Sequence, residues 1–142
     1  MSEIPDRLNI DRKDRELYNK LDSEEILKFK DNGGTRTRKE QFIFAMAYGF
    51  KLESRKPLDS MEGFVLAKDL RPDDEALINA IAIYNTKSIE ILSDQKEVFK
   101  IAEEYAHAGI ILLDSKIKST SFVSYERELE KTLHEMFQKI KL

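Results

Sequence analysis

The sequence predicts an all-α protein, a single compact domain of about five to seven helices with one optional short extended segment at residues 64–66. Apolar residues recur at helical spacing in several separate stretches of the chain. Several of these stretches follow a threonine, an aspartate or a proline, which are residues that favour the start of a helix. A chain of 142 residues buries enough surface to fold without a disulfide or a structural metal.

Two helices are predicted near the N-terminus. Residues 1–10 contain Pro5 and show no periodicity, so we expect a flexible segment there. A helix follows from Asp11, because the next apolar residues have the spacing of one helical face. A capping box at Asp22 predicts a second short helix, which is ended by the two glycines at 33 and 34.

The most apolar helix is predicted next. Thr37 stands three residues before Glu40, which is the spacing of a capping box. Residues 42–48 are then apolar on nearly every side, so we expect a central buried helix that ends at Gly49. A strand is the alternative for so short an apolar run, and the capping box, the alanines and the methionine favour a helix.

A loop over residues 51–62 and the extended segment at 64–66 lead to a further helix. It begins at Pro72, because proline suits the first turn and the three acidic residues after it complement the helix dipole. Asparagine and threonine at 85–86 end it. Ile89, Ile91 and Leu92 fit either a strand or a helical turn, and we favour the turn.

Two more helices complete the predicted domain, which spans residues 11–142. One starts near Asp94, and Gly109 either breaks it or marks close packing. Residues 114–124 are predicted as a polar linker to a C-terminal amphipathic helix that begins near Ser124. The apolar stripe of this helix either packs internally or forms a homodimer contact. Its members are Tyr125, Leu129, Leu133, Met136, Phe137 and Ile140.

Charge is unevenly distributed along the chain. The formal net charge is −3, yet residues 33–58 hold six basic and two acidic residues, and residues 59–110 hold five basic and eleven acidic residues. The basic residues flank the central apolar helix, where they either contact DNA phosphates or belong to a solvated surface. The candidate nucleic-acid-binding residues are Arg36, Arg38, Lys39, Lys51, Arg55 and Lys56.

No catalytic, metal-binding or cofactor-binding motif is found in the sequence. It contains no cysteine, which excludes thiolate zinc sites, iron–sulfur clusters and thiol nucleophiles. His107 and His134 each have a glutamate four residues earlier, which predicts ordinary contacts along a helix face. The acidic residues 73–75 point in different directions on a helix and cannot converge on one metal ion. We therefore expect a protein that is not an enzyme and binds no cofactor.

The sequence also predicts a cytoplasmic protein. Its N-terminal residues are polar and charged, without the apolar core of a signal peptide. The apolar run at residues 108–113, like the one at 42–48, is far shorter than the ~20 residues that span a bilayer. We expect no membrane contact.

Four segments together resemble one family of small proteins. They are residues 38–51, with the run Phe-Ile-Phe-Ala-Met-Ala-Tyr-Gly-Phe-Lys at its end, residues 55–58, residues 89–92 and residues 104–109. The chain resembles the proteins associated with DNA phosphorothioation (dnd) systems over roughly residues 14–113. The resemblance implies a prokaryotic accessory of a DNA modification, restriction or phage-defence system. It implies partners among the protein components of that system and no particular reaction. We expect either direct DNA contact or a protein–protein adaptor without DNA binding.

Overall fold

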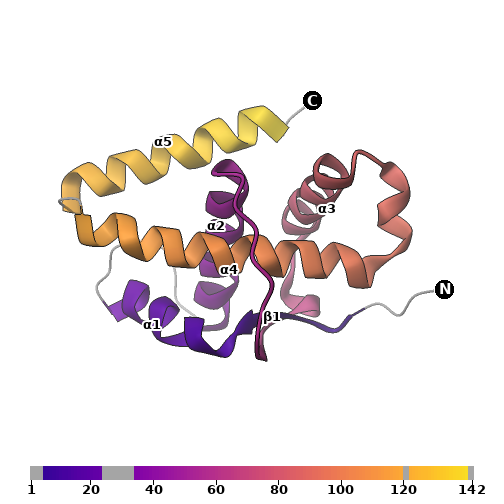
Figure 1. Cartoon of the computed structure of the whole chain (residues 1–142), viewed down its shortest axis with the longest axis horizontal. Coiled ribbons are helices and arrows are strands. Elements are labelled where there is room, and N and C mark those ends of the chain that lie inside the picture. Colours follow the sequence, from indigo (N-terminus) through magenta and orange to yellow (C-terminus); the bar gives the residue numbers. More distant parts are fainter. Residues whose placement is uncertain (1–4, 24–33, 120–121, 141–142) are drawn as a thin grey trace.

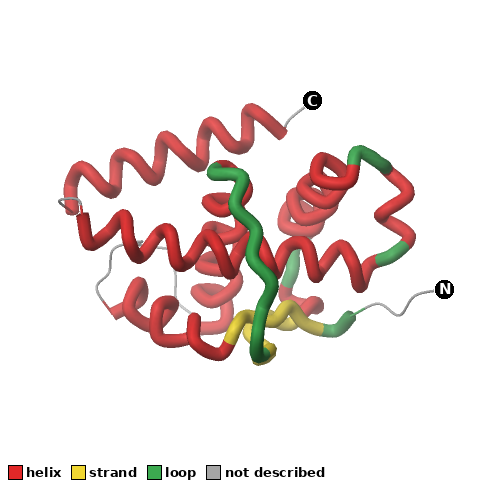
Figure 2. Tube along the Cα trace, in the orientation of Figure 1, coloured by secondary structure: helices red, strands yellow, loops and turns green. Residues whose placement is uncertain are grey.

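The computed structural model describes residues 5–23, 34–119 and 122–140, which form a mainly helical fold with one small sheet (Figures 1 and 2). The five helices of the described residues confirm the mainly helical prediction, but the sheet shows that the fold is not purely all-α. In chain order the elements are β1 (Arg7–Asp11), α1 (Arg15–Ser23), α2 (Gly34–Lys51), β2 (Met61–Leu66), α3 (Pro72–Thr86), α4 (Gln95–Ser119) and α5 (Phe122–Ile140).

Helices α2 and α4 form the centre of the fold and cross each other at very close range. Two glycines make this approach possible. A Cβ added at Gly109 would overlap the carbonyl oxygen of Ala45, and a Cβ added at Gly49 would overlap that of Tyr105. Both glycines therefore serve packing. Gly109 does not break α4, and α2 continues two residues beyond Gly49, which we had predicted as its end.

Helix α4 is enclosed from two sides. Figures 1 and 2 show α2 behind it and the loop between α2 and β2 running across its front. The backbone N–H of Lys56 in this loop donates to the carbonyl oxygen of Glu104, 3.2 Å away. As a result every residue from 101 to 110 is buried, including polar ones. The middle of α4 is therefore an interior helix.

The sheet was only half predicted. The extended segment at 64–66 is confirmed as part of β2, which pairs antiparallel with β1. Residues 7–10, predicted within a flexible segment, instead form most of β1. Leu8 and Ile10 alternate into the core at 0% and 2% exposure. A strand of five residues gains its stability from this burial and from a partner far along the chain, not from local sequence.

Helix α3 begins at Pro72, as predicted. The side chain of Asp74 accepts a hydrogen bond of 2.9 Å from the backbone N–H of Arg71, so a free N–H at the helix start is satisfied. The helix ends at Thr86, and Lys87 follows with a left-handed φ of 61°. Residues Ile89–Ser93 then form a 3₁₀ helix, which confirms the turn that we favoured over a strand.

Three other predicted boundaries differ. Helix α2 begins at Gly34, so Thr37 lies inside it and is not its N-cap. Residues 114–119, predicted as linker, continue α4, and α5 already begins at Phe122. The second short helix predicted after Asp22 lies mostly outside the described residues, although Asp22 itself belongs to α1. No described helix is long and apolar enough to cross a membrane.

Candidate functional site

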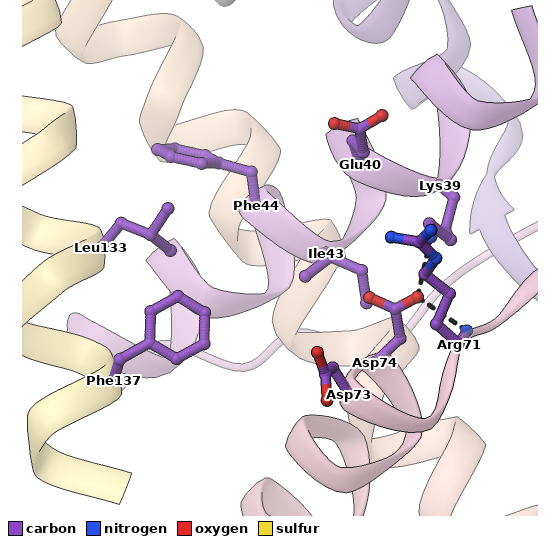
Figure 3. Close-up of a pocket in the computed structure, with 9 residues that line it drawn as sticks. All are labelled: Lys39, Glu40, Ile43, Phe44, Arg71, Asp73, Asp74, Leu133 and Phe137. Atoms are coloured by element: carbon purple, nitrogen blue, oxygen red, sulfur yellow. Dashed lines mark hydrogen bonds and ion pairs between the residues drawn. The ribbon is translucent and has the colours of Figure 1, made fainter. Parts of the chain in front are cut away.

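A groove of about 340 Å³ lies between α2, the start of α3 and the end of α5 (Figure 3). One side of it is apolar and is formed by Ile43 and Phe44 of α2 and by Leu133 and Phe137 of α5. Half of the Phe137 surface is exposed to solvent. Helix α5 packs against the rest of the fold through the buried residues Leu129 and Met136, and the groove stays open beside it.

The other side of the groove is charged. Lys39 Nζ lies 2.9 Å from Asp74 Oδ2, and the two side chains are only 11% and 17% exposed. This internal ion pair joins α2 to the start of α3. Glu40, Arg71 and Asp73 complete the charged side, and none of the three forms a further ion pair between side chains of described residues. Two acidic and one basic side chain thus remain, a net charge of −1.

Three of the six predicted DNA-binding residues are held in ion pairs with different elements. Lys39 pairs with α3, as described above. Lys51 Nζ lies 3.4 Å from Glu135 Oε1 of α5. Arg55 Nε lies 2.7 Å from Glu104 Oε1 of α4, and its Nη1 donates to Asn85.

Of the other three predicted residues, the structure describes the side chains of Arg38 and Lys56. Arg38 is exposed and lies over the ring of Phe64, 5.2 Å from its centroid. Lys56 is exposed, and its side chain makes no ion pair with a described residue. Arg36 lies in the first turn of α2, and its side chain is outside the described part of the structure. That the six residues bind DNA stays a prediction.

A second cluster of titratable groups is enclosed beneath the N-terminal segment. His107 Nδ1 lies 2.6 Å from Asp14 Oδ2, and the two residues are 4% and 2% exposed. Asp11 is adjacent, with Oδ2 4.0 Å from His107 Nε2. Burial raises the pKa of Asp14, against the hydrogen bond with His107. Asp11 is also desolvated, but hydrogen bonds from the backbone N–H groups of Asp59 and Lys13 hold its pKa below the ordinary value.

Neither histidine makes the contact predicted for it. Glu103, four residues before His107, accepts hydrogen bonds from the backbone N–H of Asn9 at 2.7 Å and from its side chain at 3.1 Å. His134 lies 3.0 Å from the side-chain nitrogen of Gln138. Within the described ranges, no group of three or more histidine or acidic residues is arranged to hold a metal ion.

The stripe of α5 packs internally in part. Leu129 and Met136 are 3% and 1% exposed and belong to the core. Phe137 is left at the groove, and the side chain of Tyr125 lies outside the described part of the chain. No motif in the sequence marks the groove. A faint signal exists in α2, where Lys39 and Glu40 stand four residues before Ile43 and Phe44, so that charge and apolar surface share one face.

Fold and site together define a small, mainly helical protein with a mixed apolar and charged groove on its surface. The family model of DNA sulphur modification system-associated protein 4 matches residues 7–140, and the chain belongs to this family. The resemblance is confirmed and reaches beyond residue 113 to include α5. Comparison with curated proteins and with solved structures finds no match. The family associates the protein with a DNA sulphur modification system.

Proposed function

We propose that the protein is a non-catalytic accessory subunit that serves its DNA sulphur modification system through contacts with other proteins of the system, not through DNA. The observation that carries this proposal is the state of the basic residues. Lys39, Lys51 and Arg55 each face a carboxylate on a different element. A phosphate would have to displace these partners, which lie on three different helices.

The enclosed histidine supports the non-catalytic part of the proposal. His107 and Asp14 have the chemistry of an acid–base pair, but both are almost completely buried, where the turn after β1 meets α4. A general base must come within hydrogen-bond reach of the substrate. This pair instead holds the N-terminal segment onto α4. It is a structural contact.

Two experiments test the proposal. Co-expression with the proteins encoded by the neighbouring modification and restriction genes, followed by purification on a tag of this chain, is expected to yield a stable complex. In gel-shift assays at low salt, sulphur-modified and unmodified duplexes are expected to show no shift. The control is the variant with Arg38→Glu and Lys56→Glu, which removes two exposed cations. A salt-sensitive shift with the wild-type protein that this variant loses would instead favour direct DNA binding.

A further inference from the structure

We propose that the groove between α2, α3 and α5 receives one large aromatic side chain of a partner protein, flanked by a lysine or arginine. This inference rests on the proposed function, because it specifies the surface and the chemistry of the protein contact. A volume of about 340 Å³ lies at the lower end of the range for ligand pockets, so it suits one or two side chains and not a whole helix.

The aromatic preference follows from the apolar side of the groove. Phe44 and Phe137 present rings there, from α2 and α5 respectively, and Ile43 and Leu133 lie beside them (Figure 3). An inserted ring can pack against the exposed part of Phe137 in offset or edge-to-face geometry, which adds to the gain from burial. Phe137 is 50% exposed, so it has apolar surface left for such a contact.

The cationic preference follows from the charged side. Lys39 is neutralised by Asp74 within the protein, at 2.9 Å. The carboxylates of Glu40 and Asp73 then exceed the single charge of Arg71, and no other described side chain pairs with either carboxylate. A lysine or arginine next to the inserted ring would reach this acidic side. An acidic residue next to the inserted ring would be repelled by the carboxylates of Glu40 and Asp73, so the groove can discriminate between partners by their charge.

The test uses the ¹⁵N-labelled full chain and three capped tripeptides as probes, followed by amide chemical shifts. Lys-Phe-Lys is expected to shift the amides of Ile43, Phe44 and Phe137 saturably. Glu-Phe-Glu is expected to bind at least roughly fivefold more weakly, because its charge is reversed. Lys-Ala-Lys is expected to show no saturable shift, because the ring is missing.

Matched variants separate the groove from the rest of the surface. Phe137→Ser is expected to weaken Lys-Phe-Lys binding roughly tenfold through loss of the aromatic wall. Asp73→Asn is expected to weaken it roughly threefold. Glu75→Gln is the control, because Glu75 is also exposed in the first turn of α3 but does not line the groove. It should leave binding unchanged, and unaltered shifts elsewhere would show that each variant is folded.

Several results would overturn the inference. These are equal binding of the acidic and basic peptides, equal effects of Asp73→Asn and Glu75→Gln, or no saturable shift at the groove with Lys-Phe-Lys. Concentration-dependent shifts of the same amides without peptide would assign the groove to a second copy of this chain. If the Phe137→Ser protein still co-purifies with its system partners, the groove is not the contact, although the proposed function stands. If no partner co-purifies with the wild-type protein, the proposed function itself fails.

Discussion

Glu103 makes the stability of this protein depend on pH in an unusual direction. Its side chain is on the interior helix α4, is 7% exposed, and accepts two hydrogen bonds from Asn9. Burial raises its pKa from 4.5 to about 7, with a smaller contribution from the charge of Glu104, although the bonds from Asn9 oppose the increase. The folded protein therefore binds this proton more tightly than the unfolded chain does.

The sign of the effect follows from linkage. In the unfolded chain the pKa of Glu103 is 4.5, and in the folded protein it is about 7. The stability that comes from Glu103 is therefore fully present below pH 4.5 and is lost as the pH rises through about 7. This difference between the two pKa values corresponds to a loss of about 3 kcal/mol in the free energy of unfolding between pH 4.5 and the folded-state pKa of about 7. Between pH 5 and 8, the free energy of unfolding should thus fall because of this one side chain.

The variant Glu103→Gln removes this titration and keeps a carbonyl oxygen that can accept both hydrogen bonds from Asn9. We expect its free energy of unfolding to exceed that of the wild type by about 1–3 kcal/mol at pH 8 and to be similar or lower at pH 4.5. Urea denaturation followed by circular dichroism at several pH values measures this difference. Subtraction of the two curves removes the contributions of the other buried carboxylates.

Glu75→Gln on the exposed start of α3 provides the control, for which the difference from wild type should hardly change between pH 5 and 8. Parallel curves for wild type and Glu103→Gln across this range would refute the reasoning. They would mean that Glu103 is ionised at the same pH in the folded and unfolded states, and that burial does not raise its pKa.

Three further predictions concern the core and are checked by thermal or urea unfolding. Gly109→Ala should destabilise the protein by about 1–3 kcal/mol or more, because its methyl group overlaps the carbonyl of Ala45; an unchanged midpoint would contradict the close crossing. His107→Leu should cost about 3–5 kcal/mol near neutral pH, since it leaves Asp14 buried without its partner. Tyr18→Phe should stabilise by about 1 kcal/mol, because the buried hydroxyl has no hydrogen-bond partner among the described residues; a clear loss of stability would reveal one.

Elements with local signals were predictable from the sequence. Helix α3 carries its own start signal in Pro72 and the acidic residues after it, so its first residue was predicted correctly. β1 carries no such signal, because its paired residues in β2 are 50 to 59 positions away and only Leu8 and Ile10 alternate into the core. Gly49 shows a related difficulty. Locally glycine favours the end of a helix, but here the approach of α4 determines its role.

The candidate site was harder to predict for the same reason. The basic residues around α2 can be counted from the sequence, but their partners cannot. Lys51 meets a carboxylate 84 positions later, and Arg55 meets one 49 positions later. The sequence therefore gives the charge of this segment, but not which of its cations are paired. The groove also depends on where α5 packs against α2, which no local pattern specifies.

The contacts between the N-terminal segment and α4 have a consequence for synthesis of the chain. Asn9 meets Glu103 and Lys20 meets Asp114, each across 94 residues, and Asp14 meets His107 across 93. At ~5–20 residues per second, a ribosome needs about 5–20 s to make that distance. Until α4 has been made, Asp14 lacks its partner His107 and stays hydrated, and β1 lacks the helix against which it packs. The segment that holds Asn9, Asp14 and Lys20 is made before α4 but reaches its folded contacts only after α4, so a nascent chain that stops before α4 lacks the surface on which this segment folds.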